Sequence, residues 1–217
     1  MAGLAAKIHF MTSLHQKHLR FFVLGDWGRE GKFGQKDMAD TMADVANFVK
    51  PDFVVSTGDN FYDEGVTDVN DILWEISFET VYHQKSLQIP WYATLGNHDY
   101  MQNPQAQVEY TEKSRRWKMP ARYYAQTFKV NYLTEALFVF LDTSPLVSDY
   151  RTPDSRVKVE DQNAEKQLQW LEETLRGSTA RWKVVVGHHP LFSAGSMHGN
   201  NPELIERLKP IFDRYQV

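Results

Sequence analysis

Four glycines in the sequence are each followed by side chains that can bind a metal ion. They stand in GDWG at 25–28, GDNFY at 58–62, GNHD at 96–99 and VVGH at 185–188. These motifs bring carboxylate, phenol, amide and imidazole groups, which are oxygen and nitrogen ligands for metals. The 217 residues contain no cysteine, so thiolate ligands are excluded. The pattern indicates a metal site made from oxygen and nitrogen donors.

The donor types favour two ions over one. Asp59 has two carboxylate oxygens and can bridge two ions. Asp26 and Tyr62 add anionic oxygens on one side, which suits a hard, highly charged ion. Asn97 and His188 add neutral donors on the other side, which suits a divalent ion. Two such ions close together can generate hydroxide at neutral pH and clamp the oxygens of a phosphoryl group.

Each motif alone has an ordinary structural explanation. An Asp after Gly at a strand end is most often a turn former, and a lone Tyr beside an apolar run is usually a core residue. His188 and His189 also fit one buried and one exposed histidine, and Asn97 fits a turn cap. The joint pattern favours the metal site, because four motifs of the same form follow apolar runs and no such cluster occurs elsewhere in the sequence.

Apolar runs predict six strands, at 19–26, 51–59, 88–99, 122–130, 136–144 and 182–190. Four of these runs lead into the four motifs. Segments of helical periodicity separate several of them, which is typical of an α/β fold in a single domain. In open α/β sheets, ligands bind beyond the carboxyl ends of the strands, where loops converge. We therefore expect the four motifs to meet in one crevice.

Three helices are predicted between the strands. In the first, Met38, Met42, Val45 and Val49 share one helical face, which we expect to be buried. The second is expected over 68–83. The third carries a buried side made of Leu168, Leu171 and Leu175.

The last segment predicts a further helix. It begins with Asn201 as N-cap and Pro202 at the first helical position. Its buried stripe consists of Leu204, Leu208, Ile211 and Phe212.

Composition limits the partners and leaves the compartment open. The net charge of −4 is spread without long runs of one sign, which argues against binding to nucleic acid or to an anionic membrane. Residues 1–18 have only short apolar pieces interrupted by Lys and His, which is a poor signal peptide and too short for a membrane span. We predict a poorly ordered N-terminal extension over 1–18.

Taken in order, the four motifs resemble those of the purple acid phosphatases, within the calcineurin-like metallophosphoesterases. The similarity is to the small, tartrate-resistant type and runs from about Leu19 to the end of the chain. GDN and GNHD alone would indicate only the superfamily, whereas Tyr62 of GDNFY is the narrower mark. The resemblance implies an αββα sandwich, in which two packed sheets are flanked by helices, over a domain at 19–217.

The resemblance also implies a ligand set. Asp26, Asp59 and Tyr62 would hold Fe(III), whose charge-transfer band with the phenolate gives these enzymes their purple colour. Asp59, Asn97 and His188 would hold Fe(II), Zn(II) or Mn(II).

Two further histidines gain catalytic roles from the resemblance. His98 would bind the phosphate and protonate the leaving oxygen, and Asp99 would orient its ring and raise its basicity. His198 would be a second histidine of this kind. His189 is not expected to be a ligand.

The sequence departs from the family in one motif. Family members carry a Gly-His-x-His motif whose two histidines each ligate one metal, and no GHxH occurs here. None of His9, His15, His18 and His83 lies in a matching context. We therefore expect a domain that is incomplete at its C-terminal end, a truncated form with one ligand fewer for each metal and an exposed sheet edge.

The implied function is that of an acid phosphatase. It would hydrolyse small-molecule phosphate monoesters with a metal-bound hydroxide at a dinuclear Fe(III)–M(II) centre. One alternative is a non-catalytic remnant that binds metal weakly, and another is a metallophosphodiesterase, which Tyr62 and GDWG disfavour. Relatives are mostly secreted, vacuolar or lysosomal. The compartment, the physiological substrate and the oligomeric state stay open.

Overall fold

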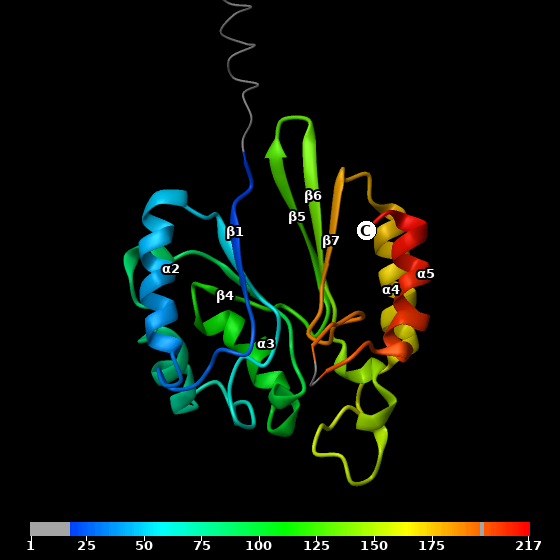
Figure 1. Ribbon diagram of the computed structural model, residues 1–217, viewed down its shortest axis with the longest axis horizontal. Helices are drawn as coiled ribbons and strands as arrows, with labels where there is room; N and C mark the ends of the chain where they lie inside the picture. Colours follow the sequence, from blue (N-terminus) through cyan, green and yellow to red (C-terminus); the bar gives the residue numbers. More distant parts are fainter. Residues whose placement is uncertain (1–17, 196–197) are drawn as a thin grey trace, which may run out of the picture.

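Two β-sheets lie face to face between helices in the computed structural model, which describes residues 18–195 and 198–217 (Figure 1). Helix α2 (Gln35–Val49) lies outside the first sheet, and α4 (Ala164–Gly177) and α5 (Pro202–Tyr215) lie outside the second. The predicted αββα arrangement is therefore confirmed. The predicted N-terminal extension falls, except for its last residue, outside the described residues.

The first sheet is parallel throughout. Its strands follow the order β1 (Phe21–Leu24), β2 (Phe53–Ser56), β3 (Trp91–Ala93) and β4 (Trp117–Lys118). All four residues of β2 are buried, as expected for a central strand that is covered on both faces. Because the strands are parallel, the loops that follow β1, β2 and β3 all leave from the same end of the sheet, where the carboxyl ends of the strands lie.

The second sheet is mixed. Strands β5 (Tyr124–Asn131) and β6 (Thr134–Phe140) form an antiparallel hairpin, and β7 (Trp182–Val186) pairs with β6 in parallel after the crossover through α4. Aromatic rings join the two sheets. The Phe53 ring stacks on Phe128, with 4.2 Å between centroids, and meets Phe138 edge-on at 5.5 Å.

The predicted buried face of α2 is wrong. Met42 is buried, but Met38 is 56% exposed, and Val45 and Val49 are exposed as well. The buried residues are Gln35, Ala39, Met42, Ala43 and Ala46. Small alanine side chains let the helix backbone approach the core closely, so the larger apolar side chains face outward.

Two other helix predictions have different outcomes. The helix predicted over 68–83 forms only in part: residues 72–73 are α-helical, Trp74–Glu79 (η1) form a short π-helix, and turns flank them. Asn201 does cap α5, because its side chain accepts a hydrogen bond from the Leu204 backbone N–H, and Leu204 and Leu208 are buried.

Several short elements were not predicted. They are η2 (Lys85–Leu87), η3 (His98–Met101), α3 (Pro104–Lys113), β4, η4 (Ser144–Leu146) and η5 (Ser148–Arg151). Within the described ranges, no helix has the length and apolar character needed to span a membrane.

Candidate metal centre

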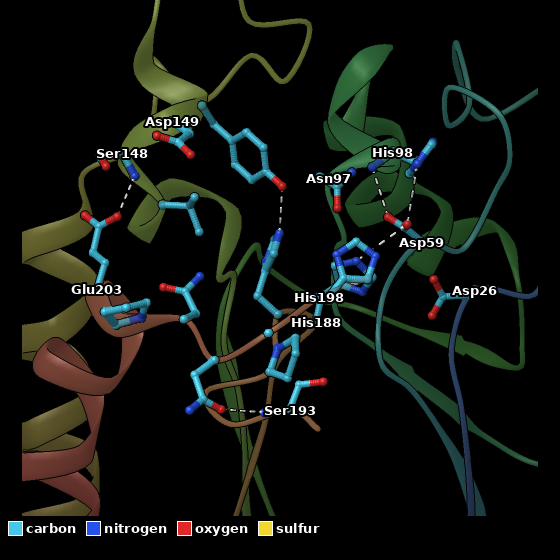
Figure 2. Close-up of a pocket in the computed structure, with 18 of the residues that line it drawn as sticks. Asp26, Asp59, Asn97, His98, Ser148, Asp149, His188, Ser193, His198 and Glu203 are labelled. Atoms are coloured by element: carbon cyan, nitrogen blue, oxygen red, sulfur yellow. Dashed lines mark hydrogen bonds and ion pairs between the residues drawn. The ribbon is translucent and has the colours of Figure 1, made fainter. Parts of the chain in front are cut away.

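The four motifs meet at the carboxyl ends of β1, β2, β3 and β7, as predicted. Asp26, Asp59, Tyr62, Asn97, His98 and His188 all line one pocket of about 820 Å³. Figure 2 shows Asp26 and Asp59 beside each other, with His98 above Asp59 and His188 next to it. The sheets thus bring together residues from distant parts of the chain.

Asp59 lies at the centre of the group and is held from three directions. Its side chain is buried, and its Oδ1 accepts a hydrogen bond from the His98 backbone N–H at 2.9 Å. Its Oδ2 accepts one from the Tyr62 hydroxyl at 2.8 Å and lies 3.5 Å from His188 Nε2. Both carboxylate oxygens therefore have fixed directions.

Tyr62 lies between two carboxylates. Its hydroxyl oxygen is 2.7 Å from Asp26 Oδ1 and 2.8 Å from Asp59 Oδ2. Burial and the negative charges of Asp26 and Asp59 raise the pKa of the phenol. The phenol has a single proton, which it can donate to only one carboxylate at a time. The guanidinium of Arg29 lies 3.6 Å from the centre of the Tyr62 ring and packs on its face.

This donor set fits a cation. Asp26, Asp59 and His188 offer ligand atoms that all lie within 4.8 Å of one another. Among the described residues that line the pocket there is no Lys or Arg to neutralise the carboxylates. The oxygens of Asp26, Asp59 and Tyr62 lie together with only the phenol proton between them. A multivalent cation can replace this proton and bind all three oxygens, and Tyr62 would then bind as phenolate.

The backbone leaves room for this packing only where glycine is present. A Cβ at Gly96 would lie 2.1 Å from Asp59 Oδ1, far inside contact distance. Gly58 has a φ of +98°, and a Cβ there would lie 2.8 Å from the carbonyl carbon of Leu95. The loops after β2 and β3 therefore approach each other at a distance that any side chain would prevent.

His188 presents one nitrogen to the site. Its Nδ1 lies 3.1 Å from the Thr57 carbonyl oxygen, so Nδ1 carries the proton in the neutral ring. The unprotonated Nε2 then faces Asp59, where a metal ligand is needed. A carbonyl that fixes the tautomer of a metal-binding histidine is a common arrangement.

Asp99 has a different role from the one predicted. The His98 Nδ1 faces the carbonyl of Asp63, and the hydrogen bonds of Asp99 go to other groups. The buried Asp99 carboxylate accepts hydrogen bonds from the backbone N–H groups of Gly96 and Asn60 and from the side-chain amide of Gln107. Burial and the charge of Asp59 raise its pKa to about 6. Asp99 thus holds the two metal-site loops together and does not orient His98.

Among the described residues, His98 and His188 are the histidines that pair with Asp59, and His189 and His198 do not. His198 lines the pocket and is exposed, next to residues 196–197, which lie outside the described part. The His189 ring is held between the hydroxyls of Thr143 and Tyr150, at 2.7 and 3.0 Å. Burial lowers the pKa of His189 to about 3, with a smaller contribution from His188. This neutral, fully hydrogen-bonded ring supports the expectation that His189 is not a ligand.

Sequence reasoning missed the opposite wall of the pocket. It is formed by Ser148, Asp149 and Tyr150 of η5 and by Glu203 at the start of α5. The Ser148 backbone N–H donates to Glu203 Oε2 at 2.8 Å, which ties the two elements together. No motif marks these residues, since they belong to a polar loop and to the first turn of a helix.

Comparisons with known proteins agree with this geometry. The sequence model of the calcineurin-like phosphoesterases matches residues 19–217. Purple acid phosphatase 3 of Arabidopsis thaliana is 39% identical over 91% of this chain, and human tartrate-resistant acid phosphatase type 5 is 34% identical over 92%. The chain spans 54% and 64% of the lengths of these two relatives.

Solved structures have the same fold. GAP50, described as the anchor in the inner membrane complex of Plasmodium, has a TM-score of 0.75 and 29% identity, with 92% of this chain and 63% of that one covered. A dimetal phosphatase from Danio rerio has a TM-score of 0.61 at 16% identity, with 91% and 78% covered. The predicted resemblance is confirmed, and the chain belongs to the calcineurin-like phosphoesterase family.

Proposed function

We propose that this chain is an acid phosphatase that hydrolyses small-molecule phosphate monoesters at a dinuclear Fe(III)–M(II) centre, where M is iron, zinc or manganese. One observation carries the proposal. The pocket groups carboxylates, a phenol and an imidazole around Asp59, and its described lining offers no Lys or Arg to a phosphate. Bound metal cations would reverse the local charge and let a phosphate dianion bind next to these carboxylates.

The contacts support a specific division of ligands. Asp26 and Asp59, whose carboxylates each lie within hydrogen-bond distance of the Tyr62 hydroxyl, would hold Fe(III) together with Tyr62. Asp59, Asn97 and His188 would hold the divalent ion. When bound, such ions lower the pKa of a water molecule and neutralise phosphoryl oxygens during in-line displacement.

His98 would deliver a proton to the leaving group. Its backbone N–H is bonded to Asp59, and its Nδ1 is turned to the Asp63 carbonyl, so its Nε2 remains for the pocket. In the protonated ring, Nε2–H can donate to the oxygen of the leaving alcohol, which general acid catalysis requires. His198, from the loop before α5, lines the same pocket and would be the second acid or phosphate-binding group.

The test is phosphate release from p-nitrophenyl phosphate by the chain loaded with iron and zinc, compared with the diester bis(p-nitrophenyl) phosphate. We expect faster hydrolysis of the monoester at mildly acidic pH and loss of activity with a chelator. His98→Ala should lower kcat by about 10²–10⁴-fold. Preference for the diester would instead support the metallophosphodiesterase alternative, and no hydrolysis of either ester would contradict the proposal.

A non-catalytic role is the second candidate, because the structurally similar GAP50 is described as an anchor. In this case the fold would serve as a binding scaffold and the metal site would bind weakly. Tight binding of two metal ions together with monoester hydrolysis would exclude this candidate.

A further inference from the structure

The pocket extends well beyond the residues that face the metals. Its volume of about 820 Å³ reaches from Asp59 to a second wall formed by η5 and the start of α5. In Figure 2 this wall, with Asp149, Ser148 and Glu203, lies across the pocket from Asp26 and Asp59. If phosphate binds at the metals, the leaving alcohol of the ester lies toward this second wall.

The second wall is negatively charged. It presents Asp149 and Glu203, and no described residue lining any part of the pocket is Lys or Arg. Glu203 Oε1 lies 3.6 Å from the Arg207 guanidinium, one turn farther along α5. Arg207 also pairs with Glu165 and does not line the pocket, so one cation is shared between two carboxylates. Asp149 is exposed and has no such partner among the ion pairs of the described residues.

Tyr150 adds an aromatic ring to the second wall of the pocket. The Tyr150 hydroxyl is hydrogen-bonded to His189 Nε2, and His189 Nδ1 is hydrogen-bonded to the Thr143 hydroxyl. These two hydrogen bonds fix the position of the Tyr150 ring. Burial raises the pKa of Tyr150, and the negative charges of Asp59 and Asp149 add to this shift. An aromatic face next to carboxylates is the combination that binds ammonium groups.

We propose that this pocket selects phosphate monoesters whose leaving alcohol carries an ammonium group, which Asp149, Glu203 and Tyr150 would bind. This orientation of the ester, with its phosphate at the metals and its leaving alcohol at the second wall, rests on the proposed function. Esters with a carboxylate or a second phosphate on the leaving group would meet two like charges and bind more weakly.

A matched pair of phosphonates tests the charge preference without relying on turnover. Aminopropylphosphonate and butylphosphonate have the same chain length and differ at the end group, an ammonium in place of a methyl. Calorimetry with the metal-loaded chain should give a Kd about 3- to 10-fold lower for aminopropylphosphonate, as expected for partly exposed charge pairs. The ratio of the two Kd values should move toward 1 as the ionic strength rises, because salt screens the charges.

Variants locate the preference on the second wall. In the double variant Asp149→Asn with Glu203→Gln, the ratio of the two Kd values should fall to about 1. The Gln side chain keeps an oxygen that can accept the Ser148 N–H, so the wall can keep its position. Asp154→Asn, an exposed acid of the same loop that does not line the pocket, should leave the ratio at its parent value.

The outcomes separate the two proposals. Equal Kd values for the two phosphonates in the parent chain, no binding of either, or an unchanged ratio in the double variant would overturn the ammonium preference. If the chain binds aminopropylphosphonate more tightly than butylphosphonate but hydrolyses no phosphate ester, the ammonium preference is supported and only the phosphatase activity is contradicted.

Discussion

The two walls of the pocket are built from different kinds of structure. The metal-facing wall consists of the loops that leave β1, β2, β3 and β7, and its central carboxylate, Asp59, is 3% exposed. The opposite wall consists of a short 3₁₀ turn and the first turn of a helix, and its Asp149 is exposed.

The hydrogen bonds differ in the same way. Asp59 and Asp99 accept several hydrogen bonds from backbone groups and side chains that are themselves packed. The opposite wall depends mainly on two isolated hydrogen bonds, one donated by Ser148 N–H to Glu203 and one between Tyr150 and His189. Metal binding needs ligands fixed within narrow limits, whereas a charged wall can act on a ligand through a less exact geometry. Substitutions should therefore cost more on the metal-facing wall.

The largest effect is expected from Asp99→Ala. The variant leaves buried N–H groups of Gly96 and Asn60 and the amide of Gln107 without their acceptor. At about 1–3 kcal/mol for each unsatisfied buried group, with partial relaxation, the free energy of unfolding should fall by about 3–5 kcal/mol. Urea denaturation measures this change. Asp149→Ala on the opposite wall should change it by less than about 0.5 kcal/mol, and equal costs would remove the contrast between the walls.

Gly96→Ala should weaken metal binding. Its Cβ would displace Asp59 Oδ1, which lies 2.1 Å from that position. We expect about a 10- to 100-fold loss of metal affinity in a titration with zinc. Gly177→Ala is the control, since an added Cβ there has no heavy atom within 4 Å. An unchanged affinity in Gly96→Ala would show that the position of Asp59 does not determine binding.

Asp142 connects the two sides of the molecule and should give stability a pH dependence. Its buried carboxylate accepts a hydrogen bond from Tyr100 of η3, and its backbone pairs with Gln167 of α4. Burial raises its pKa from 3.8 to about 7. The protonated form is therefore favoured by folding, and this stabilisation is complete below the unfolded pKa and is lost as the pH rises through 7.

The variant Asp142→Asn removes this titration. Between pH 5 and 8, the parent chain should lose about 2–3 kcal/mol more unfolding free energy than the variant. Urea denaturation at several pH values measures the slope. Identical slopes for both chains would show that Asp142 is ionised throughout this range.

The smallest effect is expected at the start of α5. Asn201→Ala removes the acceptor for the Leu204 N–H, and loss of such a cap costs about 1 kcal/mol. Asn163→Ala, which removes the corresponding cap of α4, should cost a similar amount. Metal affinity should not change in either variant. A loss of metal in Asn201→Ala alone would mean that the second wall also positions the metal ligands.

The contrast between the walls also explains which parts could be predicted from the sequence. Asp26, Asp59 and Asn97 follow neighbouring parallel strands of the first sheet, so strand pairing brings them together. His188 follows β7 of the second sheet and joins them because the two sheets pack face to face. Tyr150 and Glu203 come from a loop and a helix start, whose approach depends on packing of the second sheet with α4 and α5.

Two failed predictions have local causes. The helical periodicity of large apolar residues predicted that Met38, Val45 and Val49 are buried. The small alanines of α2 are the buried residues instead, and these three side chains are exposed. Asp99 was expected to orient the His98 ring because carboxylates commonly hold the histidines of metal sites in this way. In the 3₁₀ turn of η3 the side chains of His98 and Asp99 diverge, and Asp99 points to the loop after β2.

The most direct test of the account is the metal content and visible spectrum of the chain reconstituted with iron and zinc at mildly acidic pH. The account predicts two metal ions per chain and a phenolate-to-Fe(III) absorption band that is lost in Tyr62→Phe. A chain that binds fewer than two ions, or a band that persists in Tyr62→Phe, would contradict the assignment of this pocket as a dinuclear centre with Tyr62 as a ligand.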